Sequence, residues 1–231
     1  MSGADDKPAH APRLYLRRRG RRTRAQARAL DTLAPRYCLE PGAPIEPAAV
    51  FGRAAPFGVE IGFGMGQALI DWALACPDWN LLGVEVYEPG IGSALLGIER
   101  HGLGNVRLVE GDAEQVLERC LAPDSVDEVR IFFPDPWPKK RHHKRRLVQP
   151  AFVALLARRL RPGGLVWLAT DWEEYAQWIA AVFDAETAFE ALRPPQVESD
   201  QPDAERPRTR FEARGRRLGH AVWDLRYVRK R

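Results

Sequence analysis

The 231-residue sequence predicts an α/β fold with a doubly wound, mostly parallel β-sheet and helices on both faces. Short apolar segments typical of strands alternate five times with segments that are apolar at helical spacing. A glycine-rich turn follows the first strand, and polar clusters follow the later ones. Right-handed crossovers between parallel strands account for this order, and ligands of such sheets bind at the carboxyl ends of the strands.

The first 56 residues lie outside this alternation. Residues 1–22 are rich in arginine and are predicted to form a disordered basic arm. Thr23 to about Pro35 is predicted to be a short helix that stops at the proline. Residues 40–57 are rich in proline, glycine and alanine and are predicted to be an extended connection. We expect residues 23–231 to form a single domain.

The alternating part supplies the rest of the predicted elements in order. The predicted strands are residues 57–61, 81–86, 106–109, 126–133 and 165–169. The predicted helices are residues 67–75, 89–101, 113–121, 147–160 and 172–183. Residues 193–208 are proline-rich and predicted to be a loop, and residues 221–228 are predicted to be a last strand.

Composition argues against several classes of protein. No apolar run approaches the roughly 20 residues of a membrane-spanning helix. The N-terminus lacks the apolar core of a secretory signal peptide. Cys38, Cys76 and Cys120 are widely spaced and form neither a disulfide framework nor a CxxC metal pair. We therefore expect a cytoplasmic protein without metal or membrane association. The sequence leaves open whether it is a monomer or a homodimer.

Positive charge is gathered in three segments. The formal net charge is +4, but residues 1–30 carry +7, residues 139–146 carry +6 and residues 206–231 carry +8. The remaining chain is correspondingly acidic. A solvated surface explains any one basic run, whereas three runs around the expected site favour a nucleic-acid partner, since cationic side chains pair with its phosphates.

The first motif is the segment Glu60–Gly66, which follows the first predicted strand. Its glycines, Gly62, Gly64 and Gly66, allow the backbone to turn tightly and approach a ligand. A dinucleotide fingerprint requires glycine where Gln67 stands, which disfavours a nicotinamide oxidoreductase. Glu60 suits a cationic or amine-bearing ligand better than a pyrophosphate. A purely structural turn is the alternative interpretation.

Acidic residues follow the next two strands. Glu85 ends the second predicted strand, where a carboxylate can accept hydrogen bonds from both hydroxyls of a ribose. Asp112 follows the third strand, where it can accept from an adenine amino group or cap the next helix. A surface glutamate and a simple helix cap are the alternatives, and the cap is compatible with a ligand role.

The segment Phe132–Arg146 is the most specific motif. Prolines restrict the backbone around Asp135 to extended geometry beside the aromatic Trp137, and a run of cations follows from Lys139 to Arg146. A carboxylate, an aromatic ring and dense positive charge indicate a nucleobase pocket with a phosphate clamp. For His142 and His143, a surface or phosphate contact is favoured over a metal, because no companion ligands have suitable spacing.

Two further clusters complete the set. Asp171 follows the fifth strand and either faces the same cleft as Asp135 or, like Thr170, caps the next helix. In the tail, Thr209 and Glu212 can hydrogen-bond a ligand or form a capping box.

Together these residues resemble one family, the bacterial-type tRNA (guanine-N(7)-)-methyltransferases. The resemblance runs from about Phe57 to Tyr227. It rests on the glycine turn, Gly83–Val86, Phe132–Trp137 with the basic run, Ala169–Trp172, Thr209–Glu212 and Leu218–Asp224. The glycine turn is common to many methyltransferases, whereas the Pro-Asp-Pro-Trp loop and the Thr-x-Phe-Glu tail are specific to this family.

The resemblance implies a seven-stranded Rossmann-like sheet, S-adenosylmethionine as methyl donor, and a tRNA guanine (nucleotide 46 of the variable loop) as acceptor. It implies three groups of site residues. The cofactor site would hold Glu60, Gly62, Gly64, Gly66, Glu85, Asp112 and Asp135, the last also being catalytic. The substrate site would hold Lys139, Asp171, Thr209, Arg210, Phe211 and Glu212. RNA contacts would come from Arg141, His142, His143, Lys144, Arg145 and Arg146.

The chemistry agrees with this resemblance. Nitrogen-7 of guanine carries a free lone pair and no proton, so it can attack a sulfonium methyl group without a general base, and the enzyme supplies positioning and electrostatics. Methyltransferases that act on amino groups of nucleic acids have a motif similar to Asp-Pro-Pro-Tyr, whereas this chain has Asp-Pro-Trp-Pro from Asp135 to Pro138. A non-catalytic RNA-binding protein would keep the basic segments but would have no need of Glu60, Glu85 and Asp135.

Overall fold

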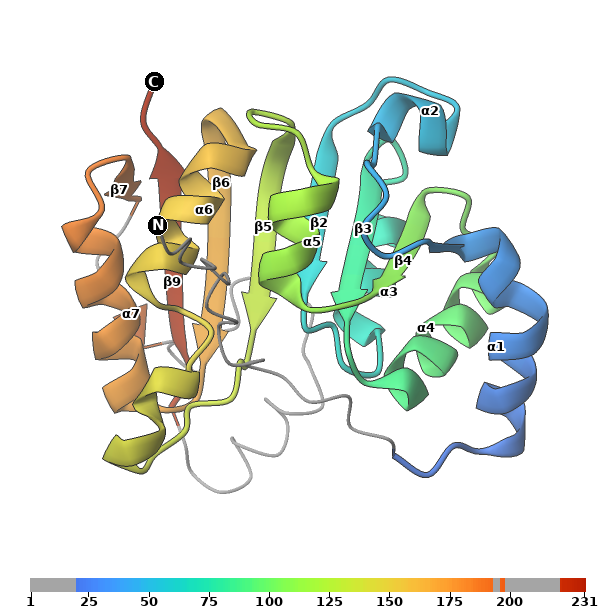
Figure 1. Cartoon of the computed structure of the whole chain (residues 1–231), viewed down its shortest axis with the longest axis horizontal. Helices are drawn as coiled ribbons and strands as arrows, with labels where there is room; N and C mark the ends of the chain where they lie inside the picture. The colour runs from blue at the N-terminus through green and yellow to red at the C-terminus, as the bar shows by residue number, and fades with distance from the viewer. Residues whose placement is uncertain (1–19, 193–195, 198–220) are drawn as a thin grey trace, which may run out of the picture.

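Residues 20–192, 196–197 and 221–231 are described by the structure, a computed structural model (Figure 1). The strands are β1 (Cys38–Leu39), β2 (Phe57–Ile61), β3 (Asn80–Glu85), β4 (Val106–Glu110), β5 (Val126–Phe132), β6 (Leu160–Thr170), β7 (Phe189–Ala191), β8 (Gln196–Val197) and β9 (Trp223–Arg229). The α-helices are α1 (Arg24–Tyr37), α2 (Pro47–Phe51), α3 (Gln67–Ala75), α4 (Glu88–His101), α5 (Ala113–Cys120), α6 (Pro150–Arg159) and α7 (Glu173–Ala185), and η1 (Lys140–Arg145) is a 3₁₀ helix.

The nine strands of the described residues belong to one sheet of order β1-β4-β3-β2-β5-β6-β9-β7, in which β8 also pairs with β9. Strands β1 to β6 are parallel, and β9 runs antiparallel to its neighbours. Seven of the described strands have three or more residues, which is the predicted number. The chain leaves β2 toward β3 and returns to its other side at β5, so the topological switch point lies between β2 and β5.

Helices cover both faces of the sheet, as predicted (Figure 1). α5, α6 and α7 pack on one face, where Leu117, Leu156 and Phe183 belong to the larger buried cluster. α3 and α4 pack on the other face, and α1 lies against α4. Burial of each such leucine or phenylalanine contributes about 1.5–3 kcal/mol. These two apolar layers hold the strand ends in fixed relative positions.

The N-terminal region differs from prediction in two places. α1 does not stop at Pro35 but continues to Tyr37. A proline in the last turn forfeits a single hydrogen bond, and the buried ring of Tyr37 packs beneath the guanidinium of Arg107, which holds that turn. The predicted extended connection contains the short helix α2, which starts at a proline and ends at Gly52 in the left-handed conformation.

Later elements match the prediction except at their ends. β2 and α3 have the predicted bounds. α6 starts at Pro150 and not at residue 147, because proline takes the first helical position, and Leu160 belongs to β6, where it pairs with Val126. β7 was not expected. Residues 1–19 of the predicted arm and most of the loop 193–208 lie outside the described residues. No helix in the described part of the chain could span a membrane.

Candidate functional site

The predicted site residues that the structure describes lie along one edge of the sheet. Because β2 to β6 are parallel, their carboxyl ends meet at that edge, which is the lower one in Figure 1. Glu60 is the next-to-last residue of β2, and Glu85 is the last residue of β3. Asp112, Asp135 and Asp171 follow β4, β5 and β6 within three residues. The edge therefore gathers five carboxylates from five strands.

The glycine turn after β2 has a conformation that requires glycine. Gly62 and Gly66 have φ angles of +72° and +86°. A Cβ atom at Gly66 would lie 2.7 Å from the Cβ of Ala94, so this glycine lets the turn pack on α4. A Cβ at Gly62 would meet no atom of the described residues within 4 Å, so the described part of the protein leaves space beside the turn there. The backbone is thus accessible to a ligand beside the end of β2.

Glu60 is the most unusual carboxylate in this row. It is 2% exposed, and its Oε2 atom has no hydrogen-bond partner among the described residues. Burial raises the pKa of Glu60 to about 8, Arg130 opposes that rise, and the charges of Asp71 and Glu85 add to it. Such a group gains most from a ligand cation that supplies both charge and hydrogen bonds.

Arg130 is next to Glu60 in the sheet but is engaged elsewhere. The two residues are register partners on β5 and β2. The Nε atom of Arg130 donates to Glu128 at 2.6 Å, and its guanidinium lies 3.7 Å from the ring centroid of Trp72. The charge of Arg130 offsets part of the rise in the pKa of Glu60, but Arg130 gives the Oε2 atom of Glu60 no hydrogen bond. Sequence reasoning missed this arginine, because only the strand pairing places it beside Glu60.

Glu85 holds the glycine turn against the end of β3. Its Oε2 atom accepts from the backbone N–H of Gly64 at 2.8 Å, and its Oε1 atom accepts from Val86 at 2.7 Å and Tyr87 at 3.0 Å. Burial raises the pKa of Glu85, these hydrogen bonds lower it, and the charge of Asp135 raises it further. A carboxylate offers about four acceptor sites, so roughly one is left for a ligand hydroxyl.

Asp112 caps α5, the structural alternative considered above. Its Oδ1 atom accepts from the backbone N–H of Gln115 at 3.2 Å. Such a cap is worth about 1 kcal/mol, and it holds the carboxylate at the edge of the sheet.

The loop after β5 is strained on both sides of Asp135. Phe133 and Trp137 have φ angles of 53° and 44°, a region that costs a bulky residue about 1–3 kcal/mol. The rings of Trp137 and His142 pack edge to face with their centroids 5.8 Å apart. The guanidinium of Arg145 lies 5.1 Å from the ring centroid of Trp137. Asp135 itself is exposed, between Pro134 and Pro136. Strain of this kind is found where a loop is held for function.

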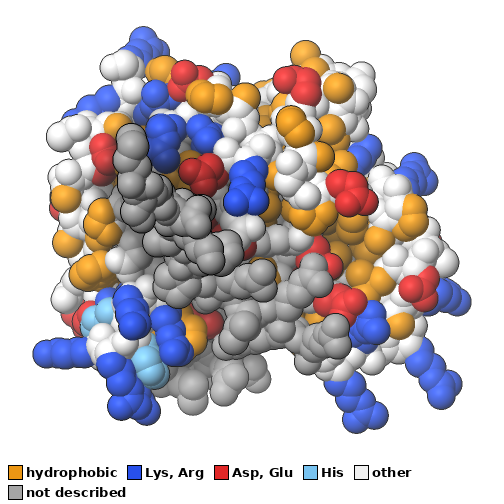
Figure 2. All heavy atoms as spheres, viewed as in Figure 1, with side chains coloured by type: hydrophobic (Ala, Val, Ile, Leu, Met, Phe, Trp, Pro, Cys, Tyr) orange, Lys and Arg blue, Asp and Glu red, His pale blue; other side chains and the backbone are white. Residues whose placement is uncertain are grey.

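The basic run forms η1 and its flanks at the same edge (Figure 1). Lys139, Lys140, Arg141, Lys144 and Arg145 are exposed, and His142 and His143 are half-buried. In Figure 2, blue and pale blue side chains gather at the lower left, where η1 lies. Partial desolvation and the neighbouring cations Arg145, Arg141 and Lys139 lower the pKa of His142. This surface is suited to phosphates.

Arg146 departs from the prediction that it contacts RNA. Its side chain is 0% exposed. Its Nε atom donates to the carbonyl of Pro136 at 2.9 Å, and its two Nη atoms donate to Glu174 at 3.1 and 2.5 Å. A side chain with no exposed surface cannot touch RNA, so the prediction is wrong for this residue. The run of cations in the sequence gives no sign that its last member faces inward.

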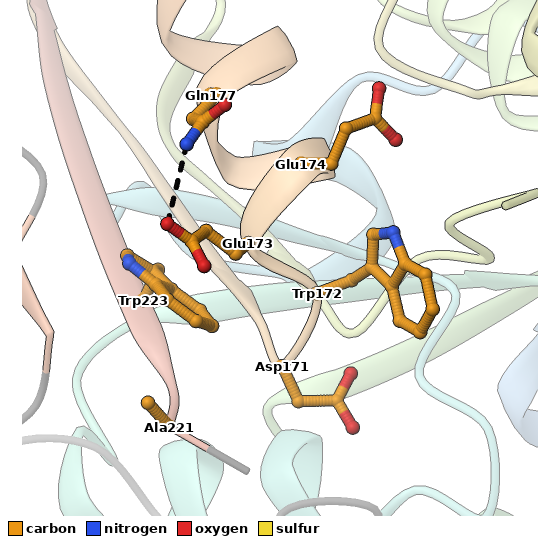
Figure 3. A pocket seen from close by; sticks show the side chains of 7 residues that line it. All are labelled: Asp171, Trp172, Glu173, Glu174, Gln177, Ala221 and Trp223. Carbon is orange, nitrogen blue, oxygen red and sulfur yellow. Dashed lines mark hydrogen bonds between the residues drawn. The ribbon is translucent and has the colours of Figure 1, made fainter.

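Asp171 lies at an open groove of about 500 Å³ lined by residues 171–174, Gln177, Ala221 and Trp223. α7 begins at Glu173, and its N-cap residue Trp172 makes no side-chain cap, so neither Thr170 nor Asp171 caps the helix. The hydroxyl of Thr170 accepts from the Trp172 N–H at 3.3 Å. In Figure 3, Glu173 points between Gln177 and Trp223, and Trp172 points to the other side. The predicted substrate residues Thr209, Arg210, Phe211 and Glu212 lie outside the described residues.

Comparisons with known proteins agree on one kind of enzyme. A family model described as "Putative methyltransferase" matches residues 54–225. A tRNA (guanine-N(7)-)-methyltransferase of Nitrosococcus oceani is 51% identical over 93% of this chain and 89% of its own length. One of Alcanivorax borkumensis is 49% identical over 94% and 91%.

Among solved structures, a 16S rRNA (adenine(1408)-N(1))-methyltransferase from Catenulisporales acidiphilia, with its cosubstrate, has a TM-score of 0.54 at 19% identity. The superposition covers 82% of this chain and 93% of the chain of that structure. A likeness at this level of identity supports the Rossmann-like fold.

Proposed function

The chain belongs to the tRNA (guanine-N(7)-)-methyltransferase family, and from this premise we propose that it methylates nitrogen-7 of guanine 46 in the tRNA variable loop with S-adenosylmethionine. The observation that carries the cofactor proposal is Glu60, a buried carboxylate with an unpaired oxygen beside an open glycine turn. S-adenosylmethionine brings an ammonium group and a sulfonium group to that edge. We place the reaction in the cytoplasm, with residues 23–231 as one domain.

The residues at the edge fit the parts of this cofactor. Glu60 would pair with the ammonium group, and the turn Gly62–Gly66 would lie against the amino-acid moiety. Three backbone donors already occupy the carboxylate of Glu85. We therefore expect Glu85 to accept a hydrogen bond from one ribose hydroxyl. Asp112 would accept from the adenine amino group while still capping α5.

The transfer itself requires positioning and a fixed negative charge. The lone pair on guanine nitrogen-7 forms the new bond to the methyl carbon as the bond from that carbon to sulfur breaks, and positive charge moves onto the base. Asp135 and Asp171, after adjacent strands, would stabilise that charge. Lys139 and the tail residues 209–212 would hold the substrate. No proton has to be removed from nitrogen-7, and no thiol nucleophile is needed; Cys38, Cys76 and Cys120 lie outside the strand-end clusters.

Methyl transfer from labelled S-adenosylmethionine to unmodified tRNA, followed by nucleoside analysis, tests the proposal directly. We expect labelled 7-methylguanosine, absent from a transcript in which guanine 46 is replaced by adenine. A different methylated nucleoside would keep the cofactor site but overturn the acceptor. Binding of tRNA without transfer would favour a non-catalytic RNA-binding protein.

The exposed cations of η1 predict a measurable salt dependence. Each phosphate contact contributes about 0.9 to the slope of log K against log salt concentration. The double variant Arg141→Gln/Lys144→Gln should therefore reduce the magnitude of this slope for tRNA binding by the contribution of about two phosphate contacts. Arg119→Gln/Arg158→Gln, which removes two exposed arginines near the C-terminal ends of α5 and α6, is the matched control and should leave the slope unchanged. Equal slopes in both variants would remove η1 from the RNA interface.

A further inference from the structure

We propose that Arg146 and Glu174 form a positioning pair that holds the loop carrying Asp135 and the turn carrying Asp171 in one arrangement. The inference rests on the proposed function, because it assigns these two carboxylates to the reacting base. The two residues are 28 positions apart in the sequence, and neither needs to touch the substrate.

The first contact fixes the loop after β5. The Nε atom of Arg146 donates to the carbonyl oxygen of Pro136 at 2.9 Å, and Pro136 directly follows Asp135. The loop contains strained residues on both sides of this point, Phe133 and Trp137. A strained segment relaxes unless its surroundings hold it, and a hydrogen bond from a charged group to its backbone opposes that relaxation.

The second contact extends the restraint to the start of α7. Glu174 lies in the first turn of this helix, three residues after Asp171. It accepts from Nη1 of Arg146 at 3.1 Å and from Nη2 at 2.5 Å, a bidentate arrangement that fixes distance and direction together. Glu174 also takes part in a hydrogen bond with the side chain of Trp172. One guanidinium therefore joins the two loops that follow β5 and β6.

The surroundings of Arg146 make the arrangement rigid. The guanidinium lies 4.9 Å from the ring centroid of Tyr175 and 5.7 Å from that of Trp178, and the side chain has no exposed surface. Lysine could supply the charge but not the planar fork that serves Pro136 and Glu174 at once. Burial of a cation is costly, and a nonpolar side chain would fill the space more cheaply. The geometry points to placement of the neighbouring loops as the role of the pair.

Two conservative variants test the pair in the full-length enzyme. Glu174→Gln keeps the shape of a half-exposed side chain, and Arg146→Lys keeps the charge without the fork. We expect each to lower kcat at saturating tRNA and methyl donor by about tenfold or more, because small displacements of positioning groups are costly. The dissociation constant for tRNA and its salt slope should stay unchanged. The double variant should be little worse than either single one, since both remove one unit.

Arg161→Lys is the matched control, because Arg161 forms an ion pair with Asp127 at 2.5 Å near the opposite edge of the sheet. It should keep the wild-type kcat. Hydrogen exchange of residues 133–139 gives a readout that does not depend on activity, and we expect about tenfold faster exchange there in Glu174→Gln than in the control.

Three outcomes would overturn the positioning role. One is wild-type kcat in both variants. Another is unchanged hydrogen exchange of residues 133–139 in Glu174→Gln. This measurement tests the pair even if the wild-type protein makes no 7-methylguanosine. The lack of that product would refute the proposed function, not the positioning role. The third is a salt slope lowered by about one contact in the charge-removing variant Arg146→Gln, which would make Arg146 an RNA contact after all.

Discussion

Replacing Glu60 with glutamine is expected to weaken S-adenosylmethionine binding by about a hundredfold and, at the same time, to stabilise the ligand-free protein. The carboxylate is buried with an unpaired Oε2 atom, and Arg130 is engaged with Glu128. Ionisation of the Glu60 carboxyl is therefore unfavourable in the free protein and becomes favourable once a ligand cation binds beside it. Glutamine keeps the shape and removes the charge, so the two effects should have opposite signs.

The sign of the stability effect follows from the pKa values. Glu60 has a pKa of about 8 in the folded protein against 4.5 as its ordinary value. Between these values the unfolded chain has lost a proton that the folded chain retains. The contribution of Glu60 to folding therefore becomes less favourable as pH rises through this window, by up to about 1.4 kcal/mol per pH unit. Below pH 4.5 the carboxyl is protonated in both states and the penalty disappears.

Thermal unfolding of wild type and Glu60→Gln at pH 5 and pH 8.5 measures this effect. The variant should be more stable by a few kcal/mol at pH 8.5, with the difference shrinking toward pH 5. Calorimetric titration of wild type with S-adenosylmethionine at pH 7, in buffers of different ionisation enthalpy, should show release of nearly one proton, and the variant should lose that release.

Glu88→Gln is the control for both measurements. Glu88 lies at the start of α4 near the same edge and forms a partly exposed ion pair with Arg22 at 2.8 Å. Such pairs are worth little, so neither stability nor binding should change much. A wild-type stability that is flat from pH 5 to pH 8.5, or a Glu60→Gln variant that binds the cofactor normally, would contradict the assignment of Glu60.

The order of strands and helices was predictable because periodicity reports which faces are buried. β2 and α3 have the predicted bounds because a glycine turn separates them and Pro77 ends the helical pattern. Short elements were missed where pairing with distant strands decides the structure. β7 has three residues and exists because β9 lies beside it, in a register that no local pattern encodes.

The site divides in the same way. The five carboxylates could be predicted from position alone, since each lies at the end of a strand or within three residues after it. Their surroundings could not, because they depend on contacts between distant parts of the chain. Glu85 is surrounded by backbone donors from two turns, and Arg146 meets Glu174 across 28 residues. No pattern in the sequence singles out Glu174, and Arg146 is one of six cations between Lys139 and Arg146.

Replacing Asp135 with alanine is expected to lower turnover by about 10²–10³ at saturating methyl donor and tRNA. Asp135 is exposed at the edge of the sheet, and the loop that carries it is strained at Phe133 and Trp137 and bound at Pro136 by Arg146. A fixed carboxylate of this kind costs no reorganisation when charge develops on the base. Asp78→Ala, which removes an exposed carboxylate in the turn after α3, should keep wild-type turnover.

Asparagine at position 135 separates charge from hydrogen bonding. If Asp135 acts through its charge on the developing 7-methylguanine cation, Asp135→Asn should be nearly as slow as Asp135→Ala. If its part is to orient the base through a hydrogen bond, the amide oxygen can still accept, and the loss in kcat should be much smaller. Because Asp135 also lies near enough to raise the pKa of Glu85, cofactor affinity has to be measured separately in each variant. Wild-type turnover in Asp135→Ala would exclude Asp135 from the transition state and leave Asp171 as the carboxylate that stabilises the charged base.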